Sequence, residues 1–385
     1  MINNKIDNRL KKILSLGIED RNIECLIHVN SIKQAKNMLA KDGICVAAEL
    51  PFINALSVVI PAKKLSGLSM NRNIIYISSE SSVEALMHIA KRALKVDKIP
   101  CKNSQTAVAY IDTGITPHLD FTLRRNRIIQ FVDLINGKKH PYDDNGHGTF
   151  VAGVGSGNGL ISNGKYVGVA PNSNIIAVKA LDSDGEANAT KILEGMQWVY
   201  DNKDKYNIKV VCMSFGSDPL GMNDPIMKGA EVLWNSGIAV VSAAGNSGPA
   251  YETIKSPGIS PRIITVGGMN DNRFDDDFKE EFFEIANFSS RGPALNRYKP
   301  DVVAPSVEIN SCHNKNFYTV LSGTSVATPM IAGLCALAFD KNKRLRPDMI
   351  KRALVASCKG ITFNRNLEGF GIPNAEKFMS FISRF

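Results

Sequence analysis

The sequence lacks an apolar run long enough to cross a membrane. Its longest strongly apolar stretch, Met330 to Phe339, falls well short of the ~20 residues that a transmembrane helix needs. Residues 1–20 alternate charged and short apolar groups, without the continuous apolar segment or small-residue cleavage site of a secretory signal. Basic residues exceed acidic ones by nine but form no block. We therefore expect a protein that binds neither membranes nor nucleic acid.

Paired cysteines are also missing. The seven cysteines are an odd number, and their spacing contains no Cys-x-x-Cys pair and no Cys/His metal pattern. Cys212 and Cys335 lie instead within apolar runs, where a thiol packs as a small hydrophobic group. Free buried thiols are typical of a reducing compartment, so we expect a cytoplasmic protein.

The chain is long enough for one large and one small domain, and its 44% hydrophobic and 22% charged residues are ordinary for a globular protein. The N-terminal part begins with an amphipathic helix over 1–20. After it, hydrophobic patterning and a Ser31 helix cap predict the order strand, helix, strand, strand, typical of a small α+β module. The predicted strands are 23–29, 44–50, 55–60 and 74–77, and a second amphipathic helix covers 83–94.

The larger region alternates strand and helix patterns, which favours a mostly parallel sheet covered by helices. Its predicted strands are 107–111, 175–180, 210–213, 239–243 and 263–266. Its predicted helices are 148–155, 190–200, 224–236, 325–339 and 347–357.

Two short segments place candidate catalytic groups beside glycines. Asp112 ends a predicted buried strand and is followed by Thr-Gly, at the sheet edge where active sites collect in open α/β sheets. His147 stands at a loop-to-helix junction between glycines, which let other groups approach the ring. Taken alone, the first segment is better explained as a strand end, and the second is equally well explained as a helix-capping loop. His118 is a rival histidine, but it lacks the flanking glycines.

The third segment, Ser322-Gly-Thr-Ser325-Val-Ala-Thr-Pro, is the strongest signal. Ser325 begins an apolar helix, whose N-terminal N–H groups favour negative charge developing nearby. A structural cap would account for one hydroxyl there, but not for Thr324, Ser325 and Thr328-Pro329 together with the other two segments.

The three segments, in this order and spacing, resemble the signatures of the subtilase family from about Thr106 to Ala375. The resemblance implies an α/β fold: a subtilisin-like three-layer sandwich with a mostly parallel sheet, plus a small N-terminal α+β module like a propeptide. It divides the chain into residues 1–82 and 83–385. It also implies a serine endopeptidase that works through an acyl-enzyme.

The resemblance further implies the roles of individual residues. Asp112, His147 and Ser325 are the catalytic triad, and Asn246 with the Ser325 N–H forms the oxyanion hole. Substrate is expected between Asp182 to Asn188 on one wall of the cleft and the strand ending in Ser214, Phe215 and Gly216 on the other. The uncharged Ala243, Ala244 and Gly245 suggest a pocket for a hydrophobic residue before the scissile bond.

In the same family, a βαββ module commonly acts as a propeptide that assists folding and then blocks the cleft. We therefore expect a self-inhibited zymogen whose segment 78–83 lies in the cleft and is cut there by autoprocessing. An unrelated accessory domain is the alternative for this module. No cofactor is expected to be required. Calcium binding stays open without an assigned ligand, although Asp120 matches a calcium position of some secreted subtilases.

A catalytically silent subtilase-fold scaffold that binds peptides is the competing function. Loss of a triad residue would indicate it, and here the triad and Asn246 are all present. Phe150 departs from the small residue or histidine usual after His-Gly-Thr, but it changes no catalytic group. The sequence therefore favours an active peptidase acting on protein or peptide substrates.

Overall fold

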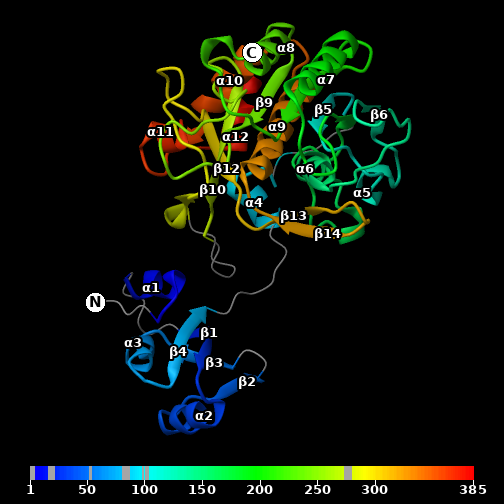
Figure 1. Cartoon of the computed structure of the whole chain (residues 1–385). Coiled ribbons are helices and arrows are strands. Elements are labelled where there is room, and N and C mark those ends of the chain that lie inside the picture. Colours follow the sequence, from blue (N-terminus) through cyan, green and yellow to red (C-terminus); the bar gives the residue numbers. More distant parts are fainter. Residues whose placement is uncertain are drawn as a thin grey trace. The chain divides into compact units, whose positions relative to one another are not determined.

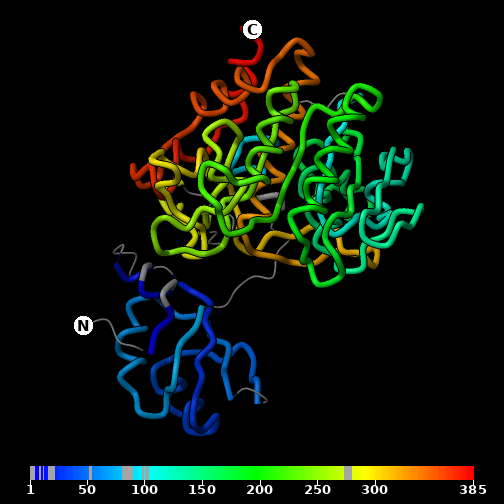
Figure 2. Tube along the Cα trace, turned by 45° about the horizontal axis from the view of Figure 1, so that its top comes forward, coloured from blue at the N-terminus to red at the C-terminus, as the bar shows by residue number. Residues whose placement is uncertain are grey.

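The computed structural model describes residues 5–15, 22–51, 54–79, 87–97, 99, 104–272 and 280–385. It divides into two compact units, Met1–Glu84 and Ala85–Phe385. The colours in Figure 2 show that each unit is formed by one continuous stretch of chain. The two units have separate hydrophobic cores.

The small unit is an antiparallel sheet in the order β2-β3-β1-β4, packed against helices. Alternate residues of β1 are buried, which is typical of a sheet covered on one face. The predicted cap is present, since Ser31 Oγ accepts a hydrogen bond from Gln34 N at 3.4 Å. The short helix α3 was not predicted. The elements are β1 (Asn22–Val29), α2 (Ile32–Lys41), β2 (Val46–Leu50), β3 (Ala55–Pro61), α3 (Lys64–Ser69) and β4 (Ile74–Ser79).

Residues 5–15 contact β4. The predicted first helix is present over α1 (Asn8–Ser15), and residues 16–21 lie outside the described residues. Ile6 forms a parallel bridge with Ile77. The carboxylate of Asp7 accepts hydrogen bonds from Ser79 N at 2.5 Å and Ser79 Oγ at 2.8 Å. The beginning of the described chain is thereby fixed to the end of the last strand of its unit.

The large unit is built on an eight-stranded sheet in the order β11-β10-β9-β8-β5-β7-β6, with β12 also paired to β10. Every pairing is parallel except that of β10 with β11. All residues of β5 and β9 are buried, as expected for central strands with helices packed on the sheet. The strands are β5 (Ala107–Asp112), β6 (Ile128–Asp133), β7 (Asn174–Lys179), β8 (Ile208–Met213), β9 (Ala239–Ala243), β10 (Ile264–Asn270), β11 (Glu284–Ile285) and β12 (Val302–Pro305).

Helix α9 runs through the middle of the large unit, with α6 beside it (Figure 1). Helix α9 packs on β5, β8, β9, β10 and β12. Helices α7 and α8 pack on each other, and α7 also packs on β5 and α8 on β9. The nine α-helices described in this unit are α4 (Met87–Ala93), α5 (Leu119–Thr122), α6 (His147–Ser156), α7 (Ala189–Asn202), α8 (Pro225–Asn235), α9 (Thr324–Lys341), α10 (Pro347–Ala356), α11 (Arg365–Glu368) and α12 (Ala375–Ile382). Two small antiparallel pairs complete it: β13 (Ile309–Cys312) with β14 (Tyr318–Leu321), and β15 (Cys358–Lys359) with β16 (Ile372–Pro373).

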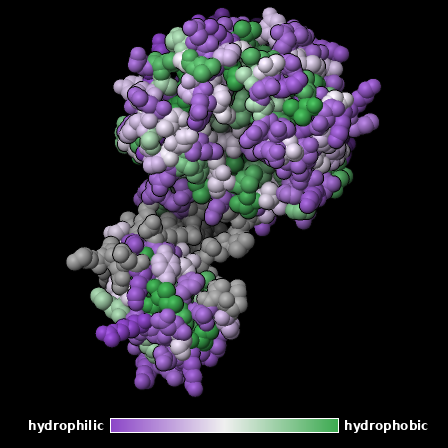
Figure 3. Space-filling view, viewed as in Figure 1, coloured by the Kyte–Doolittle hydropathy of each residue, from purple (hydrophilic) through white to green (hydrophobic). Residues whose placement is uncertain are grey.

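On the face drawn in Figure 3, hydrophobic side chains form small patches separated by hydrophilic ones. None of the helices among the described residues combines the length and apolar character needed to span a bilayer.

Candidate active site

Asp112 is the last residue of β5, and its side chain is only 2% exposed. Its Oδ1 atom accepts two hydrogen bonds, from Thr113 N at 2.8 Å and from His147 Nδ1 at 2.7 Å. The buried strand therefore fixes a carboxylate directly beside the histidine ring.

His147 is the first residue of α6, and 29% of its side chain is exposed. Gly146 before it has φ 109°, a left-handed conformation that favours glycine. Burial lowers the pKa of His147, but the charge of Asp112, the hydrogen bond to Asp112 and the charge of Asp143 together raise it above its ordinary value. Because Nδ1 faces Asp112, Nε2 is the ring nitrogen left to exchange a proton.

A buried carboxylate that sequence reasoning missed, Asp143, organises the loop before His147. Its Oδ1 accepts hydrogen bonds from Thr113 Oγ1 at 2.9 Å and Gly146 N at 2.8 Å. Its Oδ2 accepts from Thr149 N at 2.9 Å and Thr149 Oγ1 at 2.7 Å. The start of α6 is thus attached to the residue that follows Asp112. An acidic residue four positions before the histidine was the available signal.

Lys179, at the end of β7, is a second residue that the sequence reasoning missed. Its fully buried Nζ donates to Thr113 O at 2.7 Å, Leu181 O at 2.9 Å and Asp144 Oδ1 at 2.6 Å. A buried ammonium needs such partners. Lys179 therefore joins the ends of β5 and β7 to the loop before His147. A lysine closing an otherwise apolar strand was the sequence signal for it.

Ser325 lies in the first turn of α9, where backbone N–H groups have no intrahelical partner. The carbonyl of Ser325 also lacks its usual helical partner, because Pro329, four residues later, has no N–H. Ser214 Oγ donates to this carbonyl at 3.0 Å instead. The predicted substrate wall is thereby attached to the backbone of the predicted nucleophile.

Asn246 follows β9 and is exposed. Its Oδ1 accepts hydrogen bonds from Thr324 N at 2.9 Å and Thr324 Oγ1 at 3.0 Å, so its amide N–H groups point elsewhere. A Cβ atom placed on Gly323 would lie 3.2 Å from Ser325 Oγ and 3.3 Å from Asn246 Nδ2. The Ser325 hydroxyl and the Asn246 amide therefore flank the same glycine.

The structure brings Asp112 and His147 into direct contact, and α6 packs against α9. No hydrogen bond joins Ser325 Oγ to His147 within the described part of the chain. In an unliganded peptidase such a bond is often long and tightens only when substrate binds.

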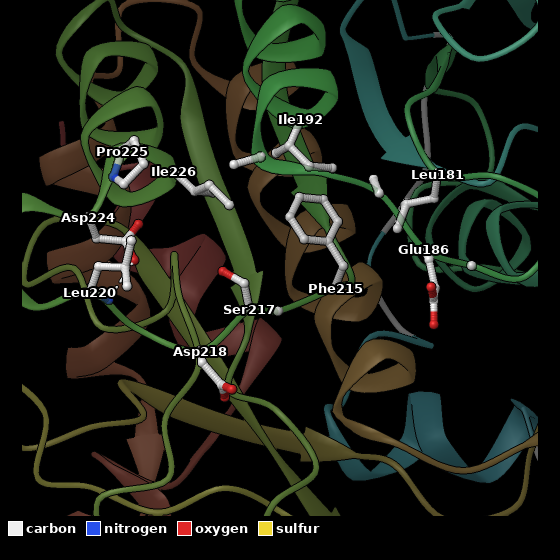
Figure 4. A pocket seen from close by; sticks show the side chains of 14 residues that line it. Leu181, Glu186, Ile192, Phe215, Ser217, Asp218, Leu220, Asp224, Pro225 and Ile226 are labelled. Carbon is white, nitrogen blue, oxygen red and sulfur yellow. Dashed lines mark hydrogen bonds between the residues drawn. The ribbon is translucent and has the colours of Figure 1, made fainter.

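The two predicted substrate walls enclose a pocket of about 440 Å³, which we call the Phe215 pocket; it is lined by residues of 181–192 and 215–226. In Figure 4 the Phe215 ring lies between Leu181 and Ile226, near Ile192. The lining is mostly apolar, and Gly216 contributes to it. This lining suits an apolar side chain.

Ala243 and Ala244 are buried, and Gly245 is partly exposed. Gly245 N donates to Thr324 Oγ1 at 3.2 Å. The same threonine hydroxyl therefore contacts both Asn246 and the predicted pocket wall.

His118, Asp120 and Cys312 are buried, and their ligand atoms lie within 4.8 Å of one another. The Asp120 carboxylate already accepts hydrogen bonds from Tyr318 Oη at 2.7 Å, Cys312 Sγ at 3.7 Å and Ile161 N at 3.2 Å. Burial and the nearby Asp120 raise the pKa of the Cys312 thiol well above its ordinary value. Calcium prefers a shell of oxygen ligands, so a neutral thiol and an imidazole beside Asp120 do not fit it.

Comparison with known proteins identifies the fold. Residues 103–372 match the model of the subtilase family. The chain is 37% identical to serine protease AprX of Bacillus subtilis (strain 168) over 97% of its own length and 88% of that protein. It is 32% identical to subtilisin DY of Bacillus licheniformis over 70% of its length and 90% of that protein.

Solved structures agree on the fold. The S41 psychrophilic protease superposes with a TM-score of 0.65 at 26% identity, over 76% of this chain and 99% of that one. Sphericase superposes with a TM-score of 0.64 at 24% identity, with the same coverage. The predicted subtilisin-like α/β fold is thereby confirmed, and the chain belongs to the subtilase family of serine endopeptidases.

Proposed function

We propose that this subtilase hydrolyses peptide bonds with Ser325 as nucleophile, His147 as general base and Asp112 as the residue that orients the imidazole. The observation that carries the proposal is the 2.7 Å bond between His147 Nδ1 and Asp112 Oδ1. It fixes the tautomer in which Nε2 accepts a proton, and the Asp112 charge stabilises the imidazolium that forms.

In the proposed reaction, Ser325 Oγ attacks the scissile carbonyl and its proton passes to His147 Nε2. The tetrahedral intermediate then loses the amine, which takes that proton, and leaves an ester on Ser325. Water activated by the same histidine hydrolyses this ester.

The oxyanion accepts hydrogen bonds from the Asn246 amide and the Ser325 N–H. The two bonds that hold Asn246 Oδ1 on Thr324 support this role, because they leave the N–H groups available as donors before substrate arrives.

The proposed substrate is an extended polypeptide lying between Asp182 to Asn188 and Ser214 to Gly216. Ala243, Ala244 and Gly245 form the uncharged wall for the residue before the scissile bond, and the Phe215 pocket takes an apolar side chain farther along the substrate. The proposed chemistry requires no cofactor, since the nucleophile, the general base and the oxyanion donors all belong to the chain. No calcium ligand is assigned.

The N-terminal unit is proposed to be a propeptide that blocks the cleft until it is removed. Its separate core supports this proposal, because a cut after it leaves the larger core whole. Of the proposed cleavage segment, Ser78 and Ser79 close β4, whereas 80–83 lie outside the described residues.

We also propose that the enzyme acts in the cytoplasm on protein or peptide substrates, with no nucleic acid or membrane partner. Six cysteines are free thiols in the described residues, which suits a reducing compartment.

A fluorophosphonate probe tests the enzymatic proposal, because it reacts only with an activated serine. We expect one label, on Ser325, in protein whose N-terminal unit has been removed, and none in Ser325→Ala. Absence of label in the processed wild-type protein would favour the peptide-binding scaffold instead.

A further inference from the structure

A second pocket, of about 310 Å³, lies beside the Phe215 pocket and has no role in the reaction proposed above. We call it the Ile259 pocket; it is lined by residues of 219–221, 252–259 and 293–296. Its base is formed by Ile254, Ile259 and Ala294, which are at most 8% exposed. With Met227 and Ala244 they form an apolar cluster separate from the main core. The pocket therefore has an apolar base, and its lining also includes Glu252 and Asn296.

The segment from Ser214 to Gly221 joins this pocket to the active site. Ser214 contacts the Ser325 carbonyl, residues 215–218 and Leu220 line the Phe215 pocket, and Pro219 and Gly221 line the Ile259 pocket. Neighbouring residues of one segment thus face two different pockets. Along the segment, the contact with the nucleophile comes first, then the Phe215 pocket, and then the Ile259 pocket.

Exposed apolar side chains also occur along this stretch of chain. Leu220 is 71% exposed and Met222, just beyond it, is 67% exposed. Exposed apolar side chains of this size beside an apolar pocket are typical of a binding surface.

The walls of the Ile259 pocket are held in place before any ligand binds. Ser217 and Ser256 exchange backbone hydrogen bonds of 3.0 and 2.9 Å, and Ala294 and Arg297 exchange two of 2.9 Å. Leu295 has φ 47°, a left-handed conformation that is rare for a bulky residue and persists only when its surroundings enforce it. A preformed pocket binds without an ordering cost.

We propose that the Ile259 pocket binds an apolar side chain of the substrate, farther from the scissile bond than the residue in the Phe215 pocket. Glu252 in the lining carries a negative charge, so the pocket discriminates against acidic side chains at that position. This inference rests on the proposed function, because the occupant belongs to a peptide undergoing cleavage.

Quenched fluorescent peptides of two lengths test the proposal on processed enzyme. The short peptide ends at the residue for the Phe215 pocket. Longer peptides are extended from that end and carry Leu, Ser or Asp one, two or three positions beyond this residue. At one of these positions, we expect Leu to raise kcat/KM about tenfold over Ser, as an apolar pocket does, and Asp to lower kcat/KM below the value for Ser.

Two variants locate the effect. Ala294→Leu fills the pocket and should bring the Leu-to-Ser ratio to about one. Glu252→Gln keeps the volume, so the Leu preference should remain while the rejection of Asp disappears. Ala356→Leu, at an exposed alanine of α10, is the matched control and should keep the wild-type ratio. Fluorophosphonate labelling counts the folded active sites in each preparation.

The outcomes separate the two proposals. Equal kcat/KM for Leu, Ser and Asp at every position, with the short peptide still cleaved, would overturn the pocket assignment alone. A Leu preference that survives Ala294→Leu would overturn it as well. Failure of processed wild-type enzyme to cleave any peptide would count against the proposed function.

Discussion

The charge state of His147 sets the pH range of the proposed reaction, because only the neutral ring can accept the Ser325 proton. Asp112 and Asp143 raise its pKa above 6.5, against the opposing effect of burial. Activity is therefore present above this raised pKa and is lost as the pH falls through it. We expect kcat/KM on a neutral peptide to show an acid limb with its midpoint above 6.5.

Asp112→Asn should lower kcat by about 10⁴, because an amide favours the wrong imidazole tautomer. It should also move the acid limb of the residual activity to lower pH. Asp201→Asn, at an exposed residue of α7, is the control. An unchanged acid limb in Asp112→Asn would contradict the assignment of His147 as the titrating base.

Two substitutions test the oxyanion proposal: one removes the proposed donor, Asn246, and the other removes a bond that positions it. Asn246→Ala removes a donor and should lower kcat by about 10²–10³ with little change in KM. Thr324→Val keeps the backbone N–H bond to Asn246 Oδ1 but loses the hydroxyl bond, so we expect a smaller loss of about tenfold.

Thr328→Val is the matched control, because the hydroxyl of this buried threonine of the same helix donates to Thr324 O and, among the described residues, bonds no side chain. It should lower the unfolding free energy by about 1 kcal/mol while leaving kcat unchanged. If Thr324→Val raised KM instead of lowering kcat, Thr324 would act in substrate binding rather than in positioning Asn246.

At the scale of elements, one bond joins the start of α9 to the segment that follows β8. Ser214→Ala should cost about 1–3 kcal/mol of unfolding free energy, because the Ser325 carbonyl loses its partner. In a Pro329→Ala background residue 329 regains an N–H for that carbonyl, so the cost should fall by about 1 kcal/mol or more.

Urea unfolding of the four proteins, each also carrying Ser325→Ala to prevent self-digestion, measures this coupling. If the double variant loses as much unfolding free energy as the two single variants together, Pro329 is unrelated to the Ser214 bond.

The elements that sequence reasoning predicted best are the long or strongly apolar ones. Strands β5 and β9 and helix α9 are apolar along their length, and the structure has them within two residues of their predicted bounds. The hairpin β13–β14 was missed because each of its strands has only four residues and neither alternates regularly between apolar and polar side chains.

The residues of the candidate site also differ in how well the sequence predicts them. Asp112, His147 and Ser325 stand in local motifs, whereas Asp143 and Lys179 act through contacts between segments far apart in the sequence. The Phe215 pocket likewise needs both walls of the cleft, so no single segment predicts it.

At the scale of the whole molecule, the two cores are each complete within their own unit, so removal of one should leave the other folded. We expect purified wild-type protein to lose the N-terminal unit by a cut within 78–83, read as intact mass. Ser325→Ala should remain full length until active enzyme is added.

Ser322→Ala is the control for this experiment, because Ser322 is an exposed serine three residues earlier whose hydroxyl only accepts a bond from Glu308 N. It should mature like the wild type. Wild-type protein that stays full length yet takes the fluorophosphonate label would contradict maturation while leaving the peptidase proposal standing.

The attachment of Ile6 and Asp7 to β4 also bears on aggregation. β4 is an outer strand of the small sheet, and an outer strand with free N–H and C=O groups is a template for pairing with other chains. The Ile6–Ile77 bridge and the Asp7–Ser79 bonds occupy that edge. The first residues of the described chain therefore limit strand-to-strand pairing along the β4 edge of the small sheet, and shortening the chain there would expose that edge.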